Sequence, residues 1–198
     1  MKNISYRLAT IIAISLTSII LQSCSSNDTK KEAVVRREGV KFIFPDSLIA
    51  YRPFGIENFA GRQDFEANTL RIVTFIDVSC PSCLSEIKNW EKVEQKLKKY
   101  NVPIIVICQS EDKFETFKFL CEQKKIPELK LPFYLDLKNA FFEKNSSLSA
   151  AKNQHTVLID QNNNMLILGD FTFSKTIENA YIEELNTHNH TLKRNEQN

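Results

Sequence analysis

The sequence predicts an α/β domain whose central mixed sheet is flanked by helices, and three observations lead to this fold class. An apolar, β-branched run over residues 71–77 changes at once into an amphipathic helical pattern over residues 84–100. A second apolar run, residues 102–108, is followed by another amphipathic segment. Residues 155–160 and 165–168 form two apolar runs joined by polar residues, which is typical of a β-hairpin. Strands alternating with helices and then a hairpin predict a sheet that is partly parallel and partly antiparallel.

The composition indicates one globular domain with extensions. The chain has 198 residues, 42% of them hydrophobic and 25% charged. Its 26 basic and 24 acidic residues leave a net charge of +2, which gives no reason to expect a nucleic acid partner. Five cysteines are too few for a dense disulfide framework in a chain of this length.

Residues 1–23 have the character of a signal peptide. Lys2 and Arg7 give a basic start, and the apolar stretch 8–21 is too short for a comfortable membrane span. The segment ends in Leu-Gln-Ser-Cys, and small residues before a cysteine resemble the bacterial lipobox, where the cysteine becomes the lipidated N-terminus. An ordinary cleaved signal peptide is the alternative.

The lipobox resemblance implies a location. We expect Cys24 to carry a lipid anchor to a membrane and residues 24–37 to form a flexible, polar tether. The protein would then lie in the bacterial cell envelope, facing the periplasm, where disulfides form and persist. The folded domain is expected over residues 38–186, followed by a disordered tail, residues 187–198.

The remaining elements are predicted from the same signals. Residues 40–44 and 48–51 form a β-like extension around a Pro-Asp turn, and Ser110 or Asp112 is suited to cap the second helix, which Pro127 ends. Further elements are a short strand at residues 131–135, mixed helical structure at 139–148 and a last helix from Ser174.

The stretch Ser79-Cys80-Pro81-Ser82-Cys83 lies where the first long strand meets the first long helix. The two cysteines are one helical turn apart, so a disulfide between them needs little backbone movement. Pro81 suits the first turn of a helix, where its missing N–H has no helical partner. Free backbone amides and the helix dipole at this point stabilise a thiolate at Cys80. The arrangement therefore predicts redox chemistry.

Two other interpretations of the Cys-x-x-Cys pair fit the sequence less well. Half of a zinc site would need a second cysteine or histidine pair at ligand spacing, and none follows. A static structural disulfide fits less well at a junction between strand and helix. Cys108 and Cys121 are expected to be core residues, too far apart along strand and helix to form a second redox pair.

The order strand, Cys-x-x-Cys helix, strand, helix, hairpin and terminal helix resembles the thioredoxin fold. With the lipoprotein signal, residues 38–186 are similar to the membrane-anchored TlpA/ResA-type thiol–disulfide oxidoreductases of bacteria. The resemblance implies that Cys80 is the attacking thiol and Cys83 the buried resolving thiol. It also implies that His155 and Thr156 occupy the position of the cis-proline that lines the substrate groove.

The chain departs from the family pattern in three places. His155 stands where the family has proline, and Thr74 stands where thioredoxin has a buried acid six residues before the first cysteine. Ser79 replaces the aromatic residue that precedes this cysteine. These changes affect the expected partner choice, rate and reduction potential rather than the fold.

The resemblance implies a thiol–disulfide oxidoreductase that needs no bound cofactor or metal. Its partners would be proteins carrying a disulfide or a dithiol, with an inner-membrane electron donor as a further partner. The alternative is a copper metallochaperone similar to the Sco family, which would bind Cu(I) through Cys80, Cys83 and His155. A thiol peroxidase is disfavoured, because no arginine is identifiable beside the first cysteine.

Overall fold

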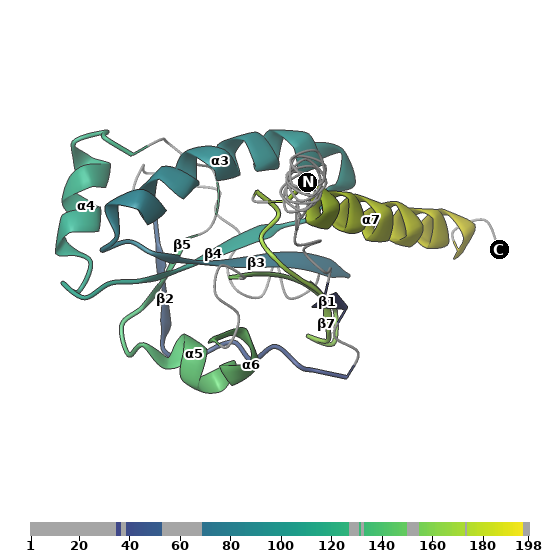
Figure 1. Ribbon diagram of the computed structural model, residues 1–198, viewed down its shortest axis with the longest axis horizontal. Coiled ribbons are helices and arrows are strands. Elements are labelled where there is room, and N and C mark those ends of the chain that lie inside the picture. The colour runs from purple at the N-terminus through teal and green to yellow at the C-terminus, as the bar shows by residue number, and fades with distance from the viewer. Residues whose placement is uncertain are drawn as a thin grey trace, which may run out of the picture. The chain divides into compact units, whose positions relative to one another are not determined.

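The computed structural model describes residues 35–36, 39–52, 69–126, 131, 133–149, 155–172 and 174–195. The chain divides into two compact units, Met1–Lys31 and Glu32–Asn198, and every described residue belongs to the second. Seven strands of this unit form one sheet in the order β1-β7-β6-β3-β4-β5-β2 (Figure 1). The strands are β1 (Val35–Arg36), β2 (Leu48–Tyr51), β3 (Leu70–Asp77), β4 (Ile104–Gln109), β5 (Phe133–Asp136), β6 (Thr156–Asp160) and β7 (Met165–Leu168). The helices are α3 (Pro81–Leu97), η1 (Lys98–Tyr100), α4 (Glu115–Glu122), α5 (Ala140–Lys144), α6 (Ser146–Ser149) and α7 (Lys175–Asn195).

The predicted mixed sheet is confirmed. Strand β3 is central and pairs in parallel with β4, which itself pairs in parallel with β5. On its other side β3 pairs antiparallel with β6, the first strand of the predicted hairpin. Every residue of β3 except Asp77 is buried, and its side chains enter a core on each face of the sheet, so its near-continuous apolar sequence is what a doubly covered central strand requires.

Alternate residues of the central strands supply two separate hydrophobic cores. Ile72 and Ile76 of β3 pack in the core that contains α3, α4 and α7 side chains, whereas Val73 and Phe75 pack in the core that contains α5 and α6. Figure 1 shows the same division, with α3, α4 and α7 on one side of the sheet and α5 and α6 on the other. Trp90 on α3 is 1% exposed and anchors the first core.

The N-terminal β extension is present, but its strands differ from the prediction. Residues 48–51 form β2, which pairs with β5 at one edge of the sheet. Residues 40–44 form no strand: Lys41 makes one isolated bridge to Asn164, although Phe42 and Phe44 are buried as in a strand. The amide side chain of Asn145 takes the place of a partner strand by bonding both to the N–H and to the C=O of Ile43. The other edge strand, β1, falls within the predicted tether of residues 24–37.

Two helix boundaries were predicted wrongly. Helix α4 begins only at Glu115, because Lys113 and Phe114 have left-handed backbone angles, φ 57° and 70°. Helix α7 continues to Asn195, so the predicted disordered tail from residue 187 is helical over most of its length. A polar segment adds turns to an already formed helix at little cost, since only nucleation is unfavourable.

None of the helices in the described part of the chain is both long and apolar enough to cross a membrane. The predicted signal peptide and Cys24 lie outside the described residues.

Candidate active site

Of the predicted site residues, Cys80, His155 and Thr156 lie at the same end of the sheet. The parallel strands β3 and β4 both end there, and the antiparallel strand β6 begins there. The amide of Phe75, near the end of β3, donates to the carbonyl of His155, just before β6, at 2.9 Å. The chain then runs from β3 through a short turn into α3, which begins directly after Cys80.

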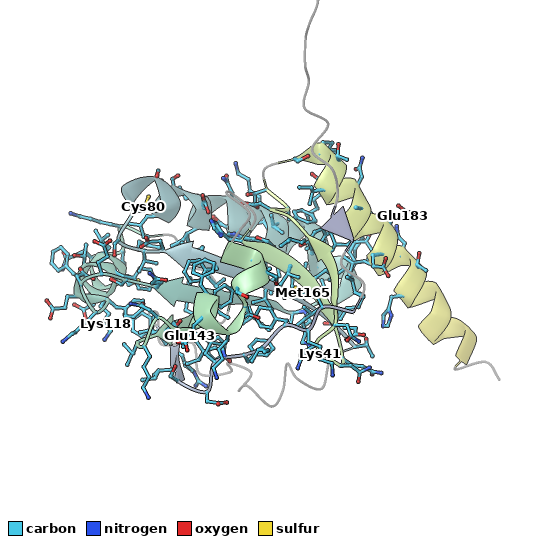
Figure 2. The ribbon with its side chains drawn as sticks, turned by 60° about the horizontal axis from the view of Figure 1, so that its bottom comes forward. Lys41, Cys80, Lys118, Glu143, Met165 and Glu183 are labelled. Atoms are coloured by element: carbon cyan, nitrogen blue, oxygen red, sulfur yellow. The ribbon has the colours of Figure 1, made fainter. Side chains whose placement is uncertain are left out.

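Cys80 is the N-cap residue of α3, as predicted. Its backbone is extended (φ −93°, ψ 116°), and its carbonyl accepts the first helical hydrogen bond, from the amide of Leu84 at 3.1 Å. Pro81 opens the helix, where a missing N–H has no cost. The side chain of Cys80 is half-buried, and Figure 2 shows it at the beginning of the helix.

A hydroxyl group lies against the Cys80 sulfur. Ser82 Oγ is 2.9 Å from Cys80 Sγ. A thiolate has no proton to donate, so in the ionised form the Ser82 hydroxyl must be the donor. A charge-assisted bond of this kind adds to the effect of the helix dipole in stabilising the thiolate.

The turn between β3 and α3 is fixed by Asp77 and by β4. The amide of Ser79 donates to the Asp77 carboxylate at 2.9 Å, and the amide of Cys80 donates to the Asp77 carbonyl at 3.3 Å. The amide of Val78 donates to the carbonyl of Gln109 at the end of β4, at 2.9 Å. Cys80 therefore follows a turn whose backbone is held at three successive amides.

The backbone of Cys83 lies in the first turn of α3, one helical turn after Cys80. Its side chain is outside what the structure describes, so the roles predicted for Cys80 and Cys83 as attacking and resolving thiols stay predictions. No group of three or more His, Cys, Asp or Glu residues that could hold a metal ion occurs among the described side chains. The Cys83 side chain is not among them, so the copper alternative also stays a prediction.

A pair of threonines occupies the place of the buried acid. Thr74 Oγ1 and Thr156 Oγ1 are 2.9 Å apart, and the two residues are only 2% and 1% exposed. Thr74 lies between Ile72 and Ile76 on β3, so the pair faces the core that contains α3. One of these hydroxyls donates to the other and neither carries a charge, so this position supplies no carboxylate base.

His155 lies beside the site, but its ring belongs to the other core. The imidazole is half-buried, 6.0 Å from the ring of Phe75 and 5.9 Å from the ring of Phe142 between centroids. Burial lowers the pKa of His155 below its ordinary value, and the nearby Asp170 carboxylate opposes this to a lesser extent. Burial therefore favours the neutral form of the imidazole. The peptide bond before His155 joins it to Gln154, which is outside the described residues.

Two acidic residues at this end of the sheet, Glu86 and Asp170, were not found by the sequence analysis, and Asp170 influences the pKa of both Glu86 and His155. Burial raises the pKa of Glu86 on α3, and the charge of Asp170 raises it further. Asp170 follows Gly169, whose φ of +148° and whose close approach to Ile177 exclude a side chain: a Cβ there would lie 2.6 Å from Ile177 Cδ1. No sequence motif connects these residues, because only the return of β7 to this end of the sheet brings them together.

The parallel β3–β4 pair, the β6–β7 hairpin and the cysteine that caps the helix between β3 and β4 are the arrangement of a thioredoxin-like oxidoreductase. The chain belongs to the Redoxin family, whose pattern matches residues 57–180. No curated protein is similar enough to count as a match.

Several solved structures are similar to the chain at low sequence identity. A putative thiol:disulfide interchange protein DsbE from Chlorobium tepidum is 13% identical, with a TM-score of 0.49 over 77% of this chain and 99% of that one. The thioredoxin domain of the thiol–disulfide oxidoreductase BVU-2223 from Bacteroides vulgatus is 17% identical, with a TM-score of 0.44 over 61% of this chain and 84% of that one. An uncharacterised thioredoxin-like protein from Bacteroides vulgatus is 17% identical, with a TM-score of 0.48 over 80% and 96%.

Proposed function

We propose that the protein exchanges disulfides with protein partners outside the cytoplasm through Cys80 and Cys83. The observation that carries the proposal is the placement of Cys80 at the N-cap of α3, half-buried and 2.9 Å from the Ser82 hydroxyl. Helix amides, helix dipole and hydroxyl all favour the thiolate, which is the form that attacks a disulfide.

The reduced protein would act in two displacement steps. The Cys80 thiolate attacks one sulfur of a partner disulfide, so that a mixed disulfide forms and the partner's other sulfur leaves as a thiolate. The Cys83 thiolate then attacks the Cys80 sulfur and releases the partner's second thiol. Two electrons have passed to the partner, and this protein is left with a Cys80–Cys83 disulfide. A donor at the inner membrane would reduce it again, through the same exchange in reverse.

The groove beside Cys80 would seat the partner chain through the backbone of His155 and Thr156. The Thr156 side chain is buried against Thr74 and its carbonyl accepts from the amide of Gly169 at 2.9 Å. The contact to a partner therefore depends on the backbone at His155 and on the exposed part of its ring. Residues 1–24 support the proposed location, with Cys24 as the lipid-bearing residue. Mass spectrometry of the N-terminal peptide from cells, compared with Cys24→Ala, tests that assignment.

The proposed reaction is tested by trapping the intermediate. Cys83→Ser should leave the mixed disulfide unresolved, so that partner proteins remain attached through Cys80 on a non-reducing gel. Cys80→Ser should trap nothing, and Cys121→Ala, which changes a buried thiol, should behave like wild type. If Cys80→Ser traps partners and Cys83→Ser does not, the two roles are reversed. If neither does and the purified protein carries stoichiometric copper, the metallochaperone is the better assignment.

A further inference from the structure

The turn that carries Cys80 is tied to a second turn by side-chain hydroxyls. Ser79 Oγ lies 3.3 Å from Ser110 Oγ, in the turn between β4 and α4, and accepts a hydrogen bond from the amide of Glu111 at 2.7 Å. Ser110 is only 8% exposed, so its hydroxyl needs protein partners. These bonds join two turns that follow neighbouring strands of the sheet.

The direction of these hydrogen bonds follows from the proton count. Ser110 Oγ donates its single proton to the Asp112 carboxylate. Ser79 must therefore be the donor in the bond between Ser79 and Ser110, while its lone pair accepts from Glu111 N–H. The result is one directed chain of hydrogen bonds from Glu111 through Ser79 and Ser110 to Asp112.

The second turn is itself held in an unusual conformation. Lys113 and Phe114 are successive non-glycine residues with positive φ, which persists only where the surroundings determine it. Asp112 and Ser110 provide those surroundings: the amide of Phe114 donates to both, at 3.1 and 3.2 Å, and the amide of Thr116 donates to Asp112 at 2.9 Å. Ser110 is thus held in place within the second turn, and its bond to Ser79 can fix the position of the turn that carries Cys80.

We propose that Ser79 and Ser110 are positioning residues for Cys80, because their hydroxyls tie the β3–α3 turn to the β4–α4 turn and hold the Cys80 sulfur at the start of α3. The proposed function explains why Cys80 needs to be positioned, but the hydrogen bonds that position it do not depend on that function. The hydroxyl of Ser79 is used in this tie and is not available to the thiol, unlike that of Ser82. Loss of the tie would let Cys80 move away from the α3 amides, whose effect on a charge is confined to the first turn.

The test is the pH dependence of Cys80 alkylation by iodoacetamide in the reduced full-length protein, followed by peptide mass spectrometry. Ser79→Ala and Ser110→Ala should each slow the reaction at pH 7 by about three- to fivefold and move its midpoint to higher pH. The double variant should be no slower than Ser79→Ala, because Ser79→Ala already removes both hydrogen bonds that join the two turns. Ser79→Thr keeps the hydroxyl at an exposed position and should retain the wild-type rate.

The controls separate positioning from stability and from the proposed reaction. Ser146→Ala removes an exposed hydroxyl on α6, on the other side of the sheet, and should leave the profile unchanged. Thermal unfolding of each variant is measured in parallel, and Ser79→Ala remains informative if Ser110→Ala fails to fold. An unchanged midpoint in Ser79→Ala, or a double variant whose effect is the product of the two singles, overturns the inference. Alkylation needs no partner disulfide, so failure of the trapping experiment would overturn the proposed function and leave this result standing.

Discussion

At the scale of single residues, the contact between the Cys80 sulfur and the Ser82 hydroxyl is the one with the most direct chemical effect. The two atoms are 2.9 Å apart at the N-terminus of α3. Ser82→Ala removes the donor, so the Cys80 pKa should rise by about half a unit to one unit, one unit being about 1.4 kcal/mol. The measurement is the absorbance of the thiolate during a pH titration of the reduced protein.

Ser85 provides the matched control for that titration. Its hydroxyl is exposed on the same helix and donates to the carbonyl of Ser82 rather than to the sulfur. Ser85→Ala should leave the Cys80 pKa where it is. An equal rise of the Cys80 pKa in both variants would mean that the structure of the first turn of α3, and not the contact between Ser82 and the sulfur, determines this pKa.

The two other described cysteines should take no part in catalysis. Cys108 and Cys121 are free thiols in the core that contains α3 and are 0% and 2% exposed, as predicted. Burial raises the pKa of Cys121 to about 11, and it raises the pKa of Cys108 still further above the ordinary thiol range. Both side chains therefore stay protonated and unreactive near neutral pH.

Replacement of either buried cysteine should change stability alone. Cys108→Ala and Cys121→Ala should each lower the free energy of unfolding by about 1 to 3 kcal/mol, because each leaves a gap in a packed core. Urea unfolding measures that change, and reduction of insulin disulfides should proceed at the wild-type rate. A disulfide between the two residues in a peptide map of native protein would contradict the assignment.

At the scale of elements, the paired strands β3 and β6 contain two buried threonines whose interaction can be measured with a double-mutant cycle. Thr74 and Thr156 satisfy each other across the two strands. Either single change to valine leaves one buried hydroxyl without its partner, and should cost about 1 to 3 kcal/mol of unfolding free energy. The double change to valine keeps the shape and removes both hydroxyls, so it should be close to neutral. A double variant as unstable as the sum of the singles would show that the hydroxyls have other partners.

The turn before α4 predicts a dependence of stability on pH. Hydrogen bonds from Ser110 and Thr116 hold the pKa of Asp112 well below its usual range. A carboxyl whose folded-state pKa is depressed contributes stability above the unfolded pKa of about 3.9, and this is lost as the pH falls further. Asp112→Asn should therefore lower the urea midpoint at pH 7, and the difference from wild type should shrink below about pH 4. A difference that is constant with pH would assign the effect to geometry rather than charge.

The strands and the starts of α3 and α4 show what the sequence could and could not predict. The apolar runs of β3 and β4, the hairpin pattern of β6 and β7 and the position of Cys80 and Cys83 were sufficient to predict the mixed sheet and the start of α3, because these patterns depend on neighbouring residues alone. The late start of α4 was not predictable, since the left-handed Phe114 is held by hydrogen bonds that its amide donates to Ser110 and Asp112.

Contacts between residues far apart in the chain could not be predicted from the sequence either. Ser79 and Ser110 are far apart in the chain, and their contact exists only because β3 and β4 are parallel neighbours that end together. Asp170 reaches Glu86 and His155 for the same kind of reason, through the return of β7. The bonds by which Asn145 takes the place of a strand partner for Ile43 likewise have no local signal.

At the scale of the whole sheet, the reactive cysteine lies on one face and the ring of His155 packs on the other. Cys80 opens the helix on the face of α3, whereas the ring of His155 packs with Phe75 and Phe142 on the face of α5 and α6. A half-buried imidazole on the second face, whose pKa is lowered by burial, has little means of influencing a thiolate on the first. We therefore expect His155 to be a packing and groove residue.

This division is tested with His155→Phe, which keeps an aromatic ring at the position and removes the titrating group. The Cys80 pKa should be the same in wild type and variant, and an increase of about one unit on substitution would instead place the imidazole beside the thiolate. Stability provides the second readout. Because burial lowers the folded-state pKa of His155, its contribution is present above the unfolded pKa of about 6.5 and is lost as the pH falls below it. Wild-type protein should therefore lose more stability than His155→Phe between about pH 6.5 and pH 5, and parallel curves would show that the imidazole is not desolvated.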